Sequence, residues 1–148
     1  MDRRAFINKT FWASGAIAFS LRLNLHAESR RNLKKVVLIG DSIRIGYQPY
    51  VVKELEENTQ IWAPDENGRT TDNIIYNLDK WIRKQQPDIL HINAGLHDIR
   101  TLSWDLGPGN TIVDHRHYKE NLETIFTWVQ KYVGCKIIWA TTTPVIDE

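Results

Sequence analysis

Three short polar segments of this sequence each follow an apolar stretch and carry side chains that could take part in acyl transfer. The first is Gly-Asp-Ser at residues 40–42, the second Glu-Asn-Gly-Arg-Thr at 66–70, and the third Gly-Leu-His-Asp at 95–98. Cleavage of an ester by a serine needs an activated hydroxyl and hydrogen-bond donors aimed at the oxyanion that develops on the substrate. A hydroxyl, a glycine amide and an imidazole are therefore the groups of interest in these segments.

Ser42 is the candidate nucleophile. It follows the run Val-Val-Leu-Ile at residues 36–39, which is short and β-branched, as is typical of a buried parallel strand. Residues beyond the carboxyl end of such a strand lie in the crevice where open α/β sheets bind ligands. We expect Gly40 to let the backbone turn tightly there. From the turn alone an equal alternative stands, in which Ser42 caps the following helix.

Strands and helices are expected to alternate along the chain. The expected strands lie at residues 36–41, 60–63, 88–94 and 136–143, and the expected helices at 47–57, 71–86 and 118–133. Apolar residues recur at helical spacing in the second and third of these helices. We expect Thr71 or Asp72 to cap the second helix and Gly134 to end the third. This alternation predicts right-handed βαβ units, hence a parallel sheet with helices on both faces.

The composition is that of one globular domain without a charged partner surface. The chain has 148 residues, 42% hydrophobic and 25% charged, and its 19 basic and 18 acidic residues give a net charge of +1. We therefore expect no nucleic-acid partner. The single cysteine, Cys135, excludes an internal disulfide and a cysteine-based metal site, and we expect it to be a core thiol. No glycine-rich phosphate loop follows the first strand, which disfavours a nucleotide-binding domain.

The N-terminal segment is expected to be an export signal. Arg3 and Arg4 precede a mostly apolar stretch at residues 11–25, and Ala27 offers a small residue for cleavage. Paired arginines are typical of the twin-arginine type. The apolar stretch is short and Arg22 interrupts it, so a stable membrane anchor is not expected. The predicted organisation is a signal peptide at 1–27, a flexible lead-in at 28–35 and one domain at 36–148, located in the periplasm or secreted.

Residues 36–144 resemble the SGNH, or GDSL-type, hydrolases, whose first three sequence blocks are similar to the three polar segments. The resemblance implies an α/β fold, a three-layer αβα sandwich with a flavodoxin-like parallel sheet, and esterase activity without a metal or other cofactor. In that family the serine, the second-block glycine and the third-block polar residue form the oxyanion hole. These roles would pass to Ser42, Gly68 and His97. The residues expected to support them are Asp41, Asn67, Gly95 and Asp98.

His97 departs from the family pattern, which has asparagine at this place. Both side chains can donate a hydrogen bond, but an imidazole also titrates near neutral pH, so its strength as a donor would depend on pH. The alternative is that His97 is only hydrogen-bonded within its loop.

The general base is unassigned. The family's catalytic Asp-x-x-His lies after a further strand and helix, whereas this sequence ends at Glu148, so we expect the C-terminal part of the domain to be missing. One Asp-x-x-His spacing occurs at residues 114–117, where Asp114 is more simply a helix cap. Neither His117 nor His115 is therefore expected to be the base, and His91, within a strand, is expected to be a core histidine.

The resulting hypothesis is an exported serine esterase that forms an acyl-enzyme on Ser42. Its substrate would be a small-molecule or carbohydrate ester, with O-acetylated carbohydrates as one candidate class. An acyltransferase and a non-catalytic binding domain of the same fold are the alternatives, and the missing base favours the latter for the chain as given. The sequence leaves the oligomeric state open.

Overall fold

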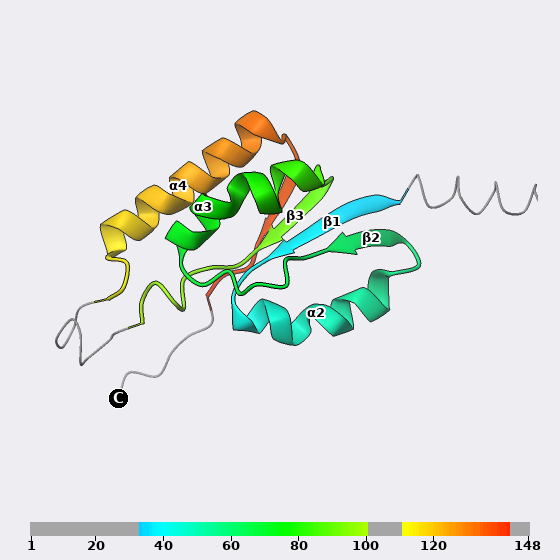
Figure 1. Ribbon diagram of the computed structural model, residues 1–148, viewed down its shortest axis with the longest axis horizontal. Coiled ribbons are helices and arrows are strands. Elements are labelled where there is room, and N and C mark those ends of the chain that lie inside the picture. The colour runs from blue at the N-terminus through cyan, green and yellow to red at the C-terminus, as the bar shows by residue number, and fades with distance from the viewer. Residues whose placement is uncertain (1–32, 101–110, 143–148) are drawn as a thin grey trace, which may run out of the picture. The chain divides into compact units, whose positions relative to one another are not determined.

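The computed structural model describes residues 33–100 and 111–142. The strands are β1 (Lys34–Ile39), β2 (Thr59–Trp62), β3 (Ile89–Ile92) and β4 (Lys136–Trp139). They alternate with the helices α2 (Ser42–Leu55), α3 (Thr71–Trp81) and α4 (His115–Tyr132), and a short 3-10 helix, η1 (Arg83–Gln85), follows α3 (Figure 1). The expected signal peptide lies outside the described residues. Within the described ranges, no helix is long and apolar enough to cross a membrane.

The four strands form one parallel sheet in the order β2-β1-β3-β4. In the middle of β1, Val36 is in register with Ile61 of β2 and with Ile89 of β3. Because the strands are parallel, the segments that follow β1, β2 and β3 leave from the same edge of the sheet. The α/β fold with a parallel sheet is therefore confirmed.

One face of the sheet packs against α3 and α4 and forms the apolar core. Leu90 of β3 is fully buried on this face, and Trp81 at the end of α3 is 2% exposed. The core also contains Cys135 as expected, and burial raises the pKa of its thiol. The other members of this buried cluster come from α3, α4 and the two inner strands, or from the residues just after them: Val37, Ile39, Ile74, Leu78, Ile82, Ile92, Ala94, Ile125 and Val129.

The opposite face of the sheet is covered by α2 (Figure 1). Successive strand residues point to opposite faces, so Val36 and Leu38, which alternate with the core residues of β1, belong to this side and are buried. The only buried side chain that α2 contributes is that of Arg44. Tyr50 of this helix is 71% exposed, and Ile138 of β4, on the same side of the sheet, is 43% exposed. The expectation of helices on both faces is confirmed. The two faces differ in polarity, because one carries the apolar cluster and the other a buried arginine.

Helix α2 begins five residues earlier than expected. Its N-cap is Asp41, whose Oδ1 accepts a hydrogen bond from the Ile43 amide at 2.9 Å. Gly46 and Pro49 both lie inside the helix, and both residue types are unfavourable there. Because of these two residues, helix propensities do not indicate that the helix begins at Ser42.

Several other element boundaries differ from expectation, among them the end of α3 at Trp81, before the expected residue 86. Strand β1 starts at Lys34, inside the expected lead-in, while β3 and β4 end at Ile92 and Trp139, before the expected ends. The N-cap of α3 is Thr70, whose hydroxyl accepts from the Asn73 amide at 3.4 Å. Neither Thr71 nor Asp72 caps the helix as expected, because both lie within its first turn.

Helix α4 starts at His115, three residues before its expected start, and its cap is Asp114. The Asp114 carboxylate accepts a hydrogen bond from the His117 amide at 3.0 Å, and this bond is the main cause that lowers the pKa of Asp114. The helix ends before Gly134, which has a φ of 68° and donates its amide to the Val129 carbonyl at 2.9 Å. The predicted helix cap and helix stop are therefore confirmed.

Candidate active site

Ser42 is the first residue of α2 and follows the carboxyl end of the inner strand β1. Its side chain is exposed, whereas Asp41 beside it is 1% exposed and caps the helix. The interpretation of Ser42 as an N-cap is therefore wrong. A carboxylate performs that function and leaves the serine hydroxyl without a capping role.

Gly40 is a glycine because its surroundings leave no room for a side chain. A Cβ on this residue would overlap the Oδ1 atom of Asn93 and would lie 2.8 Å from the Cβ of Arg44. The left-handed backbone conformations belong to Gly95 and Gly134 among the described glycines, so Gly40 does not need the freedom of a positive φ. Close packing at this turn, and not a positive φ, explains why the residue is a glycine.

The second loop lies directly against the first. The Gly68 amide donates a hydrogen bond to the Gly40 carbonyl at 2.8 Å, and a Cβ on Gly68 would lie only 2.7 Å from that same oxygen. The structure thus brings together two of the three predicted segments, backbone against backbone. It also shows that the Gly68 amide already has an acceptor, so it could serve an oxyanion only by sharing this bond or releasing it.

Side chains hold the second loop in place at successive residues. Asn67 accepts a hydrogen bond from the Arg69 amide through Oδ1 at 2.8 Å, and Arg69 has a φ of 53°, which is uncommon for a residue with a side chain. Asn73 of α3 donates to the Gly68 carbonyl at 2.9 Å, and Arg44 of α2 donates to the Glu66 carbonyl at 2.7 Å. Asn67 therefore helps to shape this loop, and its supporting role in catalysis stays a prediction.

The third loop is tied to α3 through Asp98. This carboxylate is fully buried, and its Oδ1 accepts from the Thr71 amide at 2.9 Å and from the Thr71 hydroxyl at 2.6 Å. Asn121 of α4 donates to the same hydroxyl at 2.9 Å. Gly95, with a φ of 136°, has no space for a Cβ because Thr142 and Tyr118 crowd it. Asp98 and Gly95 thus fix the segment that carries His97.

His97 itself is half-buried. Across the described ranges no hydrogen bond joins it to Ser42 or to Gly68. Its predicted role as an oxyanion donor stays a prediction, as does the catalytic role of the three residues as a group.

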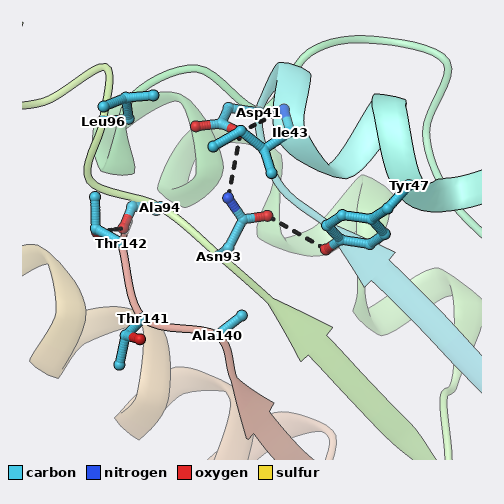
Figure 2. A pocket seen from close by; sticks show the side chains of 9 residues that line it. All are labelled: Asp41, Ile43, Tyr47, Asn93, Ala94, Leu96, Ala140, Thr141 and Thr142. Carbon is cyan, nitrogen blue, oxygen red and sulfur yellow. Dashed lines mark hydrogen bonds between the residues drawn. The ribbon is translucent and has the colours of Figure 1, made fainter. Parts of the chain in front are cut away.

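A cavity of about 180 Å³ opens at the carboxyl edge of the sheet and is lined in part by Asp41, the residue before Ser42 (Figure 2). Neither Ser42 nor His97 belongs to its lining. The lining residues come from the ends of β1, β3 and β4 and from the first turns of α2: Asp41, Ile43, Tyr47, Asn93, Ala94, Leu96, Ala140, Thr141 and Thr142.

A chain of polar side chains runs along the wall of this cavity. Asn93 donates to the Asp41 Oδ1 at 3.2 Å and accepts from the Tyr47 hydroxyl at 3.5 Å (Figure 2). The Tyr47 hydroxyl also lies 3.3 Å from the Nδ1 of His91. Burial raises the pKa of Tyr47 and lowers the pKa of His91, so both side chains favour their neutral forms. His91 thus has a polar partner within the fold, but it is half-buried and does not belong to the apolar core, so the expectation of a core histidine is wrong.

Of the two histidines in the Asp-x-x-His spacing, His117 has a side-chain partner on another helix. The Nε2 of His117 lies 3.0 Å from the Asp72 Oδ1, in a pair that links α4 to α3. His115 is exposed at the first residue of α4. In the described part of the chain, no histidine is hydrogen-bonded to Ser42, and no group of three or more His, Cys, Asp or Glu side chains could hold a metal ion.

Several residues of the site were not anticipated from the sequence, namely Arg44, Tyr47, Asn73 and Asn93. Asn93 could have been noticed, because it is a polar residue directly after a buried strand, at the edge where ligands bind. Arg44 carries no such signal, since an arginine on a helix is ordinarily exposed.

No protein-family model and no curated protein matches this sequence. Solved structures do match. The acetylxylan esterase Axe2 from Geobacillus stearothermophilus is 22% identical with a TM-score of 0.57, over 72% of this chain and 58% of that one. A GDSL-like lipase from Bacteroides thetaiotaomicron is 17% identical with a TM-score of 0.54, over 72% and 47% of the two chains. The acetyl xylan esterase AlAXEase is 15% identical with a TM-score of 0.53, over 71% and 56%.

This chain therefore spans about half the length of the proteins that it resembles. At such identities the likeness concerns the fold, and it agrees with the architecture that the sequence resemblance implied. The described part of the chain has the fold of the GDSL-like lipases and acetyl xylan esterases.

Proposed function

We propose that this chain is part of an exported ester hydrolase in which Ser42 is the nucleophile. The observation that carries the proposal is the position of Gly40-Asp41-Ser42 at the carboxyl end of the inner strand β1, in a fold shared with solved esterases. A serine hydroxyl at that edge, on an exposed first residue of a helix, is accessible to a substrate.

The proposed reaction is acyl transfer through a covalent intermediate. The Ser42 oxygen attacks the ester carbonyl carbon and its proton passes to a general base, which leaves a tetrahedral oxyanion. Collapse of this intermediate breaks the bond to the alcohol oxygen, which takes up the proton and leaves. Water then attacks the acyl-enzyme, and the acid is released as Ser42 regains its proton.

Two groups are proposed to stabilise the oxyanion. The Gly68 amide is hydrogen-bonded to the Gly40 carbonyl, close to the turn that carries Ser42. It would share this bond with the oxyanion, or exchange it, during the reaction. His97 would donate from its protonated ring nitrogen, in the place where the GDSL-type pattern has asparagine. Asp98 supports this arrangement because its two hydrogen bonds from Thr71 hold the third loop against α3.

The first experiment measures turnover of a chromogenic acetate ester by the protein expressed from its whole reading frame, so that any general base encoded after Glu148 is included. We expect Ser42→Ala to abolish turnover and to abolish labelling by a serine-directed organophosphorus probe. Thr124→Ala is the matched control, because it removes an exposed hydroxyl from α4, whose bond to the Glu120 carbonyl lies within that helix. Equal turnover by the protein and the Ser42 variant would contradict the proposal.

The second experiment tests His97. Removal of one oxyanion donor typically lowers kcat about 100- to 1,000-fold, or about 2.7–4 kcal/mol, and we expect this loss for His97→Ala. His97→Asn restores a donor of the type found in the family and should retain most of the activity. A loss much smaller than this range in His97→Ala would remove the role and leave His97 as a residue hydrogen-bonded in its loop.

The general base is proposed to lie outside the histidines described above, since His91 and His117 have other partners. The coding sequence downstream of Glu148 is the direct test, because an in-frame Asp-x-x-His there would supply the base. A non-catalytic binding domain is the second candidate function. It is favoured by the lack of a histidine bonded to Ser42 in the described ranges, and it predicts ester binding without turnover.

The proposed substrates are small-molecule or carbohydrate esters, including O-acetylated carbohydrates, outside the cytoplasm. This rests on the expected signal peptide and on the solved acetylxylan esterases that share the fold. An acyltransferase differs only in the acceptor of the acyl group. Product analysis with a sugar alcohol present separates the two, because a transferase yields a new ester and a hydrolase yields free acid.

A further inference from the structure

A buried arginine connects the helix that carries Ser42 to the loop that carries Gly68. Arg44 lies two residues after Ser42, and its side chain is 1% exposed. Its Nη2 donates to the Glu66 carbonyl at 2.7 Å, and its Nη1 donates to the Gln48 Oε1 at 2.6 Å. Both acceptors are neutral, and the Nε is buried without a hydrogen-bond partner.

Stability alone does not account for an arginine at this place. A guanidinium that is removed from water and receives only neutral acceptors loses more hydration than it regains. Asp41 and Asp65 are close enough to offset part of the effect of burial on the Arg44 pKa, but neither forms a salt bridge with it in the described structure. An apolar side chain of similar volume would cover the sheet at lower cost.

The contacts of Arg44 indicate what the charge does. The second loop has anchors of two kinds. Asn73 of α3 holds it through the Gly68 carbonyl, whereas Lys80 of α3 forms only an exposed ion pair with the Glu66 carboxylate, which contributes little. Its connections to the nucleophile turn are the bond from the Gly68 amide to Gly40 and the bond from Arg44 to the Glu66 carbonyl.

We propose that Arg44 is a positioning residue, which holds the Glu66-Asn67-Gly68 backbone against the turn that carries Ser42. The consequence for catalysis rests on the proposed function, because Arg44 would act through the Gly68 amide and not on the substrate. Since α2 supplies both Ser42 and Arg44, the nucleophile and the loop would keep a fixed spacing as one unit.

The test is amide hydrogen exchange by NMR on the full chain and on two variants. Arg44→Met removes the donors but keeps an unbranched apolar stem, and Lys80→Met, the control, removes the exposed ion pair between the same loop and α3. We expect Arg44→Met to lower the protection of the Gly68 amide about tenfold or more, as for loss of a hydrogen bond from a charged donor. The protection of Leu38 and Leu90 in the sheet, and of Gly68 in Lys80→Met, should stay unchanged.

Unchanged Gly68 protection in Arg44→Met would overturn the proposal, and so would equal losses at Gly68 and in the sheet. If Arg44→Met does not fold, Arg44→Lys replaces it. An ammonium cannot reproduce the two-pronged geometry of the guanidinium, so a smaller fall in Gly68 protection is expected. Protection equal to that of the unmodified protein in this variant would also overturn the proposal.

A second readout concerns the reaction itself. In a protein that turns over an acetate ester, Arg44→Met should lower kcat with little change in KM, because the oxyanion donor acts in the transition state. Lys80→Met should change neither constant. A protein that neither turns over the ester nor reacts with a serine-directed probe would refute the proposed function, while amide exchange still decides whether Arg44 positions the loop.

Discussion

The two faces of the sheet are covered by side chains of different polarity. The face under α3 and α4 is an apolar core, in which Leu90 and Ile125 are fully buried. The face under α2 contains a buried arginine and a chain of polar side chains from Asp41 to His91. On that second face Ile138 stays 43% exposed.

This difference separates two tasks within one small domain. Burial of apolar area stabilises the fold without fixing any direction, whereas hydrogen bonds fix distances and orientations and are costly when left incomplete. On the polar face, the Asn93 side chain donates a hydrogen bond to Asp41, the residue directly before Ser42. Stability is therefore expected to depend mainly on the first face, and the geometry of the candidate site on the second.

The largest effect should follow from a truncation on the apolar face. Leu90→Ala leaves a cavity between β3 and the helices, and we expect the free energy of unfolding to fall by about 2–5 kcal/mol. Ile138→Ala, on the other face of the neighbouring strand, should stay within about 0.5 kcal/mol. Urea unfolding measures both, and similar losses would show that the faces contribute equally.

A smaller effect should follow from overpacking the polar face. In Gly40→Ala the new Cβ meets the Asn93 amide and the Arg44 side chain, and we expect a loss of about 1–3 kcal/mol. Gly46→Ala is the control, since a Cβ there meets nothing, and it should raise helix stability by about 0.5–1 kcal/mol. Adding Asn93→Ala to Gly40→Ala should restore part of the loss. Strict additivity of the two changes would contradict the contact.

The smallest effect is a dependence of stability on pH that originates from the polar face. Because burial lowers the pKa of His91, the unfolded chain binds a proton more readily than the folded chain. The stabilising effect of the neutral form is present above the ordinary histidine pKa of about 6.5 and is lost as the pH falls through the lower folded value. His91→Gln should remove this part of the pH profile, while His115→Gln, at an exposed position, should keep it. Identical urea midpoints for His91→Gln and the unmodified protein across this range would exclude the effect.

Much of the fold follows from local patterns. The apolar periodicity near Leu78 and Val129 predicts the two helices that do lie on one face of the sheet, and the β-branched run before Gly40 predicts the inner strand. Caps with a local mechanism, such as Asp114 and Gly134, are readable because their partners lie within a few residues. The start of α2 escapes this reading, since Gly46 and Pro49 weaken the local signal while a capping carboxylate and contacts with distant loops sustain the helix.

The sequence by itself determined the alternation of strands and helices and the three polar segments at the carboxyl edge of a parallel sheet, because period and turn chemistry are local properties. Only the tertiary structure decided that Gly40 is a glycine on account of Asn93, that the Gly68 amide meets the Gly40 carbonyl, and that Arg44 is buried. Each of these facts depends on atoms more than 20 positions apart in the chain, and no local pattern encodes which distant backbone will arrive beside a given residue.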